Sequence, residues 1–239
     1  MKPIYIPKAR AKEYGDYAIN IYTGCPHRCY YCFSPMVLRK DREAFHSCVE
    51  PRPGIVEAVK RQLDKEQITG KLIHLCFTCD PYPKGYDNTP TREIIKLLKD
   101  SGNHVQILTK SNMRAARDFD LLDDQDWFGV SYAGYNEPGH PAEEPNTGTP
   151  EIRKYMLSRA HERGIKTWVS CEPVLNVDGI YDLICGGDFI DKFKIGKLNY
   201  FPSNINWHDF GHECERLCKQ FGRDYYIKDD LRKEMEKPT

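Results

Sequence analysis

The hydrophobic pattern of the chain switches repeatedly between short apolar runs and longer segments of helical periodicity. Short apolar runs typical of buried strands lie within 17–22, 71–78, 104–110, 127–133, 165–174 and 189–198. Helical spacing of apolar residues appears in 53–66, 89–102, 114–124, 150–164, 178–188 and 207–222. A closing strand with a short tail is expected over 224–236.

Residues at the ends of two of these helices support the assignment. Thr89 or Thr91 can cap the helix expected over 89–102, and Gly102 can end it. Pro150 and Gly164 stand at the start and end of the helix expected over 150–164. The intervening segment 134–150 is rich in Gly, Pro and Glu, which predicts a functional or mobile loop.

The alternation of strand and helix, repeated about six times, is typical of parallel βα units that coil in one hand. Six units are too few for a closed eight-stranded barrel. The sequence therefore predicts an α/β fold with a parallel sheet, a partial (β/α)6 TIM-like barrel. We expect one domain over 1–239, with a core of about 17–200 and a C-terminal helix and strand extension over 201–239. Chemistry in such folds collects at the carboxyl ends of the strands.

Composition narrows the possible partners and compartments. The 239 residues contain 35 Lys and Arg and 35 Asp and Glu, so no global basic field attracts nucleic acid, although a local cationic face is still possible. No apolar run is long enough to predict a transmembrane helix, and the N-terminus lacks the features of a secretory signal. We therefore expect a cytoplasmic protein without membrane contact. In a reducing compartment, some of the ten cysteines should be metal ligands or reactive thiols.

Three cysteines directly follow the first predicted strand, at the spacing C-x3-C-x2-C. Cys25, Cys29 and Cys32 can hold three irons of a [4Fe–4S] cluster and leave the fourth iron free for a small molecule. Tyr31, just before the third cysteine, can shield the cluster or contact what binds it. The alternative is a zinc loop, with His27 or a distant residue as the fourth ligand. A disulfide pair with a spare thiol is disfavoured in a reducing compartment.

The pattern C-x3-C-x-aromatic-C after a first strand closely resembles the radical SAM superfamily. The resemblance implies that the free iron binds the amino and carboxylate groups of S-adenosylmethionine (SAM). It further implies that reductive cleavage of SAM yields a 5′-deoxyadenosyl radical that abstracts hydrogen, and that an external electron donor such as flavodoxin or ferredoxin is needed.

Further stretches resemble the spore photoproduct lyase-like branch of this superfamily. They follow the second to sixth predicted strands in order: CFTCDPY (76–82), LTKS (108–111), VSYA (130–133), SCEPVL (170–175) and KIGKLNY (194–200). The matches extend over roughly 17–232. One departure is that many relatives carry a Glu soon after D-P-Y. Here either Asp87 replaces that Glu or the contact is absent.

The resemblance assigns roles residue by residue. The three loop cysteines become the cluster ligands, and Tyr31 flanks SAM. The other cofactor-binding residues are Thr78, Asp80, Lys110, Ser131 and Glu172. By the family pattern, Thr78, Cys79 and Asp80 lie where the second strand meets the SAM amino group, and Asp80 carries the charge suited to an ammonium. Lys110 and Ser131 are expected to reach the carboxylate or ribose. Each has a plainer alternative: Asp80 as a turn cap, Lys110 as a solvated lysine, and Ser131 as a backbone-bonded serine.

Spore photoproduct lyase uses a cysteine near the end of its second strand as a hydrogen-atom donor. Cys76 and Cys79 both lie in that region, and Cys171 at the fifth strand end is a third candidate. Alignment on Thr78 favours Cys76, whereas alignment on Asp-Pro makes Cys79 a SAM neighbour. Both face the site only if the strand ends between them. The alternative for Cys76 and Cys171 is a small buried hydrophobe.

Substrate signals are weaker. Basic and aromatic residues that could meet a nucleic acid are Arg39, Lys40, Arg42, Arg52, Tyr82, Tyr132, Tyr135 and Tyr200. The hypotheses are action on a nucleic acid base or nucleotide, action on a peptide or small metabolite, and a non-catalytic metal-binding module. Lesion-repair enzymes of this branch usually add sequence before the cluster, which counts against photoproduct repair. A second metal site would need Cys214 and Cys218 together with His208 or His212.

Overall fold

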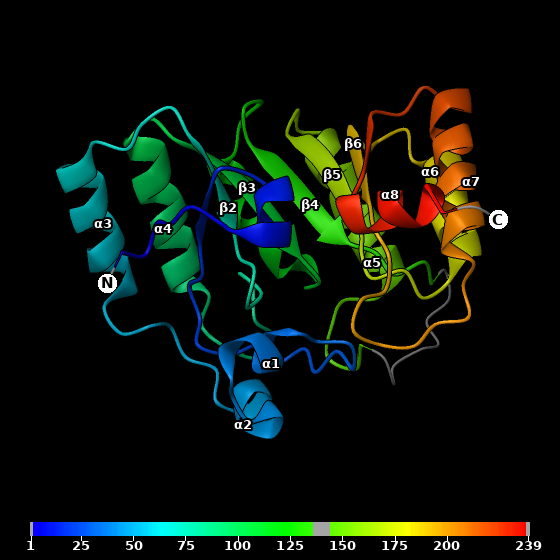
Figure 1. Ribbon diagram of the computed structural model, residues 1–239. Coiled ribbons are helices and arrows are strands. Elements are labelled where there is room, and N and C mark those ends of the chain that lie inside the picture. Colours follow the sequence, from blue (N-terminus) through cyan, green and yellow to red (C-terminus); the bar gives the residue numbers. More distant parts are fainter. Residues whose placement is uncertain (1, 136–143, 238–239) are drawn as a thin grey trace.

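The computed structural model describes residues 2–135 and 144–237, in which seven parallel strands form one curved sheet (Figure 1). The strands follow sequence order: β1 (Tyr17–Ile19), β2 (Leu72–Leu75), β3 (His104–Thr109), β4 (Trp127–Ser131), β5 (Lys166–Cys171), β6 (Lys192–Ile195) and β7 (Tyr225–Ile227). The predicted α/β fold with a parallel sheet is confirmed. The closing strand predicted within 224–236 is also confirmed, because Tyr225 pairs with Phe193 and places β7 beside β6.

Helices cover the outer, convex side of the sheet. Figure 1 shows α3 and α4 beside its first strands and α6 and α7 beside its last ones. The elements between the strands are α3 (Ile55–Glu66), α4 (Thr89–Asp100), the 3-10 helix η2 (Met113–Leu121), α5 (Pro150–His161), α6 (Val177–Gly186) and α7 (Trp207–Gln220). No helix within residues 2–135 and 144–237 is long and apolar enough to cross a membrane.

Four short elements differ from the expectation. Helix α8 (Asp229–Met235) replaces the tail expected after the last strand, and two acidic residues in its first turn favour a helix start there. Two short helices after the cysteine loop, α1 (Ser34–Leu38) and α2 (Arg42–Ser47), were not predicted. Neither was the 3-10 helix η1 (Ala9–Glu13). Elements of five or six residues carry too few apolar positions to show a period.

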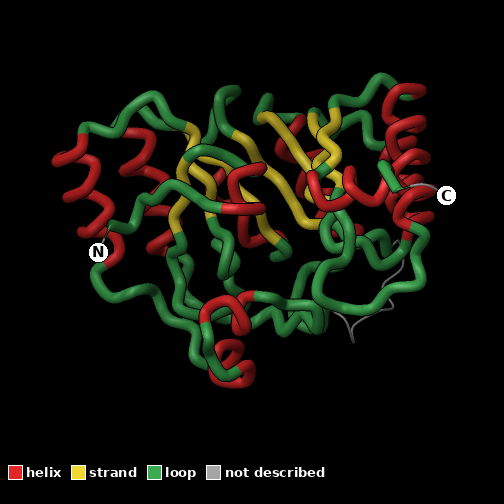
Figure 2. The backbone as a smooth tube through the Cα atoms, viewed as in Figure 1, coloured by secondary structure: helices red, strands yellow, loops and turns green. Residues whose placement is uncertain are grey.

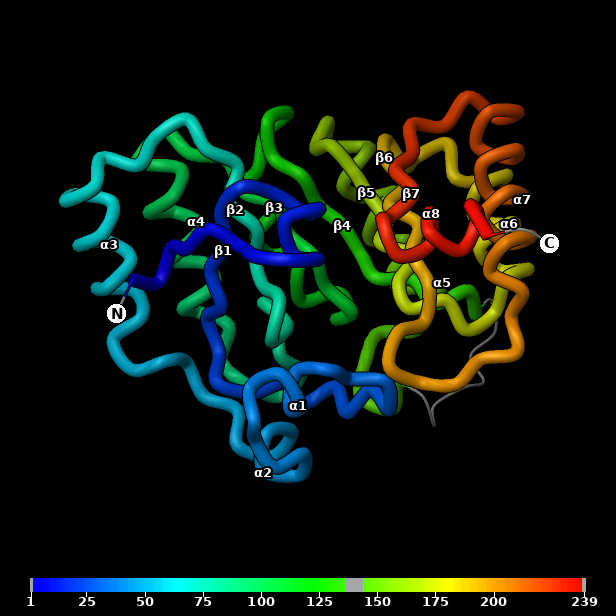
Figure 3. The backbone as a smooth tube through the Cα atoms, in the orientation of Figure 1, coloured from blue at the N-terminus to red at the C-terminus, as the bar shows by residue number. Residues whose placement is uncertain are grey.

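The segment before β1 forms an arm that crosses the concave side of the sheet, deep blue in Figure 3. Tyr5 forms an antiparallel bridge with Ala18 at the β1 edge. At the other edge, the Glu13 carboxylate accepts hydrogen bonds from the Asp229 amide at 2.8 Å and the Tyr226 hydroxyl at 3.1 Å. The arm therefore links the two edge strands of the open sheet.

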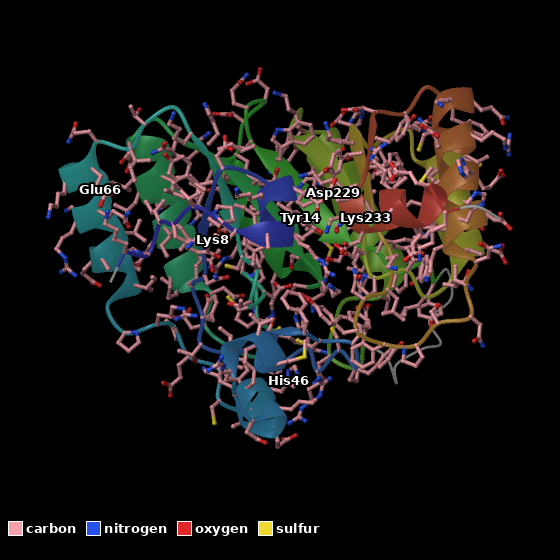
Figure 4. All side chains as sticks on the ribbon, in the orientation of Figure 1. Lys8, Tyr14, His46, Glu66, Asp229 and Lys233 are labelled. Atoms are coloured by element: carbon pink, nitrogen blue, oxygen red, sulfur yellow. The ribbon has the colours of Figure 1, made fainter. Side chains whose placement is uncertain are left out.

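Large side chains fill the amino-terminal part of the concave side. The Tyr14 ring lies 5.5 Å from His74 and 5.8 Å from Trp168, measured between ring centroids. Figure 4 shows Tyr14 near the middle of the molecule, with Asp229 beside it. Gly129 leaves room for Trp168, since a Cβ there would lie 2.2 Å from the indole nitrogen. These side chains fill the amino-terminal layer, and the cavity lies toward the carboxyl ends of the strands.

Loops gather at those carboxyl ends, at the bottom of Figure 2. The cysteine loop lies there between β1 and α1, and α2 packs beneath it. The His46 ring, labelled in Figure 4, lies 2.7 Å from the Cys25 carbonyl oxygen through its Nδ1 atom. The fold thus places the cysteine loop at the edge where the βα pattern predicts chemistry.

Candidate functional site

A cavity of about 680 Å³ opens at the carboxyl ends of the strands. All of the predicted site residues except Cys171 line it: Cys25, Cys29, Tyr31, Cys32, Cys76, Thr78, Cys79, Asp80, Lys110, Ser131 and Glu172. Segments separated by more than a hundred residues therefore meet at one space, as expected when successive parallel strands end at the same edge.

Cys171 lies on the other face of β5. Its neighbours Ser170 and Glu172 line the cavity, and alternation along the strand turns Cys171 outward into the core, where it is fully buried. Burial, and next the nearby Cys218, raise the pKa of its thiol. The structure therefore argues against Cys171 as a hydrogen donor to the cavity and favours the alternative of a small buried hydrophobe.

Arg42 organises the cysteine loop. Its guanidinium donates to the carbonyl oxygens of Cys29 at 2.6 Å, Tyr30 at 2.9 Å and Cys32 at 3.2 Å. These bonds hold the loop backbone and leave the sulfur atoms to the cavity. The expectation that Arg42 faces a phosphate is corrected: its donors are engaged by the loop. No local spacing in the sequence links Arg42 to these carbonyls.

The three loop cysteines fit a multi-iron cluster better than a zinc ion. Thiolates on one zinc ion lie about 3.8 Å apart. Within the described part of the chain, only His104, Asp123 and Asp126 bring three such ligand atoms within 4.8 Å of one another, so the three loop sulfurs are spread more widely. The His104 group needs no metal, because the Lys99 ammonium already pairs with both carboxylates.

The loop thiols need a bound cationic group in order to ionise. Burial, and next the Glu144 carboxylate, raise the pKa of Cys29 to about 12. Burial, and next Asp80, also raise the pKa of Cys25. Such thiols ionise only when a cationic group binds them. His27, the alternative fourth zinc ligand, instead directs Nδ1 toward Asp80, 3.6 Å from the carboxylate oxygen.

Asp80 joins the ends of β2 and β3. Its Oδ1 atom accepts hydrogen bonds from the Tyr82 amide at 2.8 Å and from the Thr109 hydroxyl at 2.7 Å. Its Oδ2 atom accepts the Lys110 amide at 2.8 Å. The turn-capping alternative is therefore realised, and Oδ2 keeps capacity for one further donor. A carboxylate held by three donors is a fixed part of the cavity wall.

Two other predicted residues offer polar groups to the cavity. The Thr78 hydroxyl oxygen is buried and has no hydrogen-bond partner within the described residues. A buried polar atom without a partner is costly, which favours a bound ligand at this position. The Lys110 ammonium lies 5.6 Å from the centroid of the Tyr31 ring, so the cation stands beside the cysteine loop.

The far wall of the cavity carries a network that sequence reasoning missed. Glu172 accepts from the Tyr14 hydroxyl at 3.0 Å, from the Asn199 side-chain amide at 3.0 Å and from the Lys228 ammonium. The Tyr14 hydroxyl also lies 3.1 Å from Ser170 Oγ. The arm and the end of β7 thus complete the wall. Only the three-dimensional structure brings these separate segments together.

Arg153 and Glu144 form a second missed network. Fully buried Arg153 donates to the carbonyl oxygens of Gly148 at 2.8 Å and Ser131 at 2.9 Å, and to the Glu144 carboxylate. Glu144 also accepts from the Tyr31 hydroxyl. One buried ion pair therefore connects the cysteine loop, the end of β4 and helix α5. The loop expected over 134–150 lies partly outside the described residues, which resume at Glu144.

The aromatic residues expected to stack a base divide into two groups. Tyr82 and Tyr132 are 0% and 1% exposed, so the structure corrects the expectation that they meet a substrate. Tyr200 is 59% exposed at the mouth of the cavity. The Arg10 guanidinium lies 5.1 Å from its ring centroid. Tyr135 is half-buried.

The suggested second metal site does not form. Cys214 and Cys218 are fully buried in the core under α7. His208 contacts Asp209 at 3.0 Å, and the exposed His212 reaches the Met235 carbonyl at 3.3 Å. The cysteines and histidines occupy different sides of the helix, because positions two apart on a helix do not face each other.

Gly24 is required by the close approach of α2. A Cβ at this position would lie 2.2 Å from the Phe45 carbonyl oxygen, which also accepts the Cys25 amide. We expect Gly24→Ala to shift the cysteine loop, destabilise the protein by about 1–3 kcal/mol and lower iron uptake. Thermal denaturation and iron analysis measure this. Gly15→Ala is the matched control, since no atom lies within 4 Å of its Cβ position. Equal behaviour of the two variants would contradict the expectation.

Comparison with curated proteins identifies distant relatives. Uncharacterized protein ORF301 of Acidianus two-tailed virus is 31% identical over 177 residues, covering 68% of this chain and 58% of its own. Uncharacterized protein MJ0683 of Methanocaldococcus jannaschii is 28% identical, with coverage of 73% and 64%. Uncharacterized protein Rv2578c of Mycobacterium tuberculosis is 28% identical, with coverage of 71% and 52%. The chain thus spans between half and two-thirds of these relatives.

Solved structures share the fold at low sequence identity. Spore photoproduct lyase complexed with dinucleoside spore photoproduct superposes with a TM-score of 0.68 at 14% identity, covering 93% of this chain and 79% of that one. Streptococcus suis SuiB bound to S-adenosylmethionine gives 0.63 at 13% identity, covering 88% and 46%. Residues 19–176 match the family described as the Radical SAM superfamily. With this match over more than half of its length, the chain belongs to the radical SAM superfamily.

Proposed function

We propose that this protein is a radical SAM enzyme in which Cys25, Cys29 and Cys32 ligate a [4Fe–4S] cluster and the adjoining cavity binds SAM. The observation that carries the proposal is the meeting of these three cysteines with the predicted SAM-binding side chains around one cavity. When bound, the cluster supplies the electron that cleaves SAM to a 5′-deoxyadenosyl radical for hydrogen abstraction.

The cavity wall offers partners for the carboxylate, amino and ribose groups of SAM. The Lys110 ammonium suits the carboxylate, and the free capacity of Asp80 Oδ2 suits the amino group. The unpartnered Thr78 hydroxyl lies at the same end. Ser131 and Glu172 stand further round the sheet, where the ribose hydroxyls would extend. The side chains of this chain thus bind and orient the cofactor.

For the substrate, we propose a nucleic acid base or nucleotide. Exposed Tyr200, with the Arg10 guanidinium over its ring, offers a stacking surface at the cavity mouth. Exposed Lys8 lies on the same rim. The structural neighbour complexed with a dinucleoside photoproduct supports this class by analogy of fold.

A peptide is the second candidate. Phe33 and Val37, which are 41% and 55% exposed, also line the cavity, and Met36 of the same helix α1 is 57% exposed. Such an apolar rim suits peptide side chains. The neighbour SuiB is described as bound to a precursor peptide.

We further propose an external electron donor, such as flavodoxin or ferredoxin, and a cytoplasmic location that keeps cluster and thiols reduced.

Anaerobic reconstitution with iron and sulfide tests the proposed activity. We expect a brown protein with about four irons per chain that converts SAM to 5′-deoxyadenosine when dithionite is added. Zinc at one equivalent and no 5′-deoxyadenosine would overturn the proposal and leave the non-catalytic metal-binding module.

Deuterium transfer separates the two substrate classes. Extensively deuterated oligonucleotides and deuterated peptides are offered in parallel to the reconstituted protein. Deuterium in 5′-deoxyadenosine from the oligonucleotides alone supports the nucleotide class, and deuterium from the peptides alone rejects it in favour of the peptide.

A further inference from the structure

Helix α2 holds the backbone of the cysteine loop at several points. The Phe45 carbonyl oxygen accepts a hydrogen bond from the Cys25 amide at 3.2 Å, and His46 Nδ1 lies 2.7 Å from the Cys25 carbonyl oxygen. Arg42, the first residue of the helix, donates to three further loop carbonyls, two of which belong to proposed cluster ligands. The guanidinium therefore has a fixed position beside the loop that would carry the cluster.

The positive charge of Arg42 is not neutralised by a neighbouring acid. Within the described part of the chain, every hydrogen bond that its guanidinium donates goes to a loop carbonyl and none goes to a carboxylate. The acids on either side of it serve other groups. Asp41 Oδ1 accepts a hydrogen bond from the Ala44 amide at 2.8 Å, and Glu43 accepts one from the Arg28 guanidinium at 2.7 Å. Arg42 thus adds an uncompensated positive charge to the loop.

Other cations near the loop differ from Arg42 in charge balance or in position. Arg153 is paired with the Glu144 carboxylate. Lys40 donates to the Thr23 carbonyl at 2.8 Å, ahead of the first cysteine. Lys110 lies on the cavity side, where we assign it to the SAM carboxylate. Of these cations, Arg42 combines an uncompensated charge with direct contacts to the backbone of two ligand residues.

We propose that Arg42 raises the reduction potential of the cluster that the loop holds. The proposal rests on the proposed function, because the cluster is part of it. Reduction brings one electron from the external donor and adds one negative charge, and no covalent bond of the chain changes. A fixed positive charge beside the loop stabilises that added charge, since net charge around a cluster is one of the factors that set its potential. Arg42 acts here as a positioning residue that contacts neither SAM nor substrate.

A redox titration of the reconstituted protein without SAM tests the proposal. The signal of the reduced cluster in electron paramagnetic resonance is followed against the solution potential. Arg42→Gln removes the charge and keeps a side-chain amide donor. We expect a tenfold weaker reduction equilibrium, which corresponds to about 59 mV lower potential for one electron. Iron content should stay at about four per chain. A larger effect is not expected, because the exposed guanidinium is screened by solvent and salt.

Two further variants separate the role of Arg42 from that of surface charge in general. Arg42→Lys keeps the charge but loses the planar fork that reaches three carbonyls, so we expect an intermediate, about threefold, weakening of reduction. Arg39→Gln removes the same charge from an exposed residue at the end of α1, whose side chain donates to no loop carbonyl among the described residues. We expect it to change the equilibrium less than about twofold.

Each outcome bears on the proposal. An unchanged potential in iron-loaded Arg42→Gln would overturn it, as would equal shifts in Arg42→Gln and Arg39→Gln. Where only Arg42→Lys holds iron, an unchanged potential in that variant would overturn it instead. Loss of iron from both Arg42 variants would also reject it, because Arg42 would then be required for cluster assembly. Absence of an iron–sulfur cluster in the unmodified protein would reject the proposed function itself, so the two failures are distinguishable.

Discussion

Replacing Cys29 with alanine is expected to abolish the cluster and to reduce SAM cleavage to background. Cys29 is 7% exposed and lies between the other two ligands in the loop, whose carbonyl at this residue is held by Arg42. Without Cys29 the loop would offer only the thiolates of Cys25 and Cys32 to the cluster. Iron analysis, the visible absorbance of the reconstituted protein and 5′-deoxyadenosine formation measure the loss.

The matched control for this variant is Cys48→Ala. Cys48 is exposed, does not line the cavity and follows α2, so its removal should leave iron content and SAM cleavage unchanged. Far-ultraviolet circular dichroism should show that Cys29→Ala stays folded, because the removed thiol fills little of the core. Retention of about four irons by folded Cys29→Ala would contradict the assignment of this ligand.

Replacing Arg153 with methionine is expected to destabilise the protein by about 3–5 kcal/mol. The change leaves the buried Glu144 carboxylate without its cation and frees the carbonyls of Ser131 and Gly148. Glu144 also accepts a hydrogen bond from the Tyr31 hydroxyl. A displaced Glu144 should therefore make the cysteine loop more mobile as well. Chemical denaturation measures the stability, and the affinity for SAM measures the effect on the site.

Two further variants make the Arg153 result specific. Arg159→Met lies on the same helix, where the arginine side chain is 43% exposed and pairs with Glu162 at 3.7 Å, so its cost should stay below about 0.5 kcal/mol. Adding Glu144→Gln to Arg153→Met should restore part of the lost stability, because the unpaired buried charge disappears. Equal stabilities of Arg153→Met and Arg159→Met would show that the buried pair contributes nothing.

The elements predicted from periodicity are present in the structure, because the buried face of each helix or strand fixes the spacing of its apolar residues. Residues 71–78 contain β2, and 150–164 contain α5, whose predicted first residue Pro150 is its first residue. The short elements α1, α2 and η1 were missed, because five or six residues carry too few apolar positions to show a period. Lys228 and Tyr14 in particular join the cavity wall only through a network with Glu172, which tertiary packing creates.

The sequence by itself determined the parallel βα architecture and the three-cysteine loop after the first strand. The resemblance to the spore photoproduct lyase-like branch singled out the polar residues that reach the cavity, and strand order places the ends of parallel strands at the same edge. Only the tertiary structure decided that Cys171 turns away from the site and that both Cys76 and Cys79 line the cavity. It also decided that Arg42, Arg153 and Glu144 support the loop. Side-chain direction at a strand end, and contacts between segments far apart in the chain, depend on where the backbone turns. That is settled by packing rather than by local pattern.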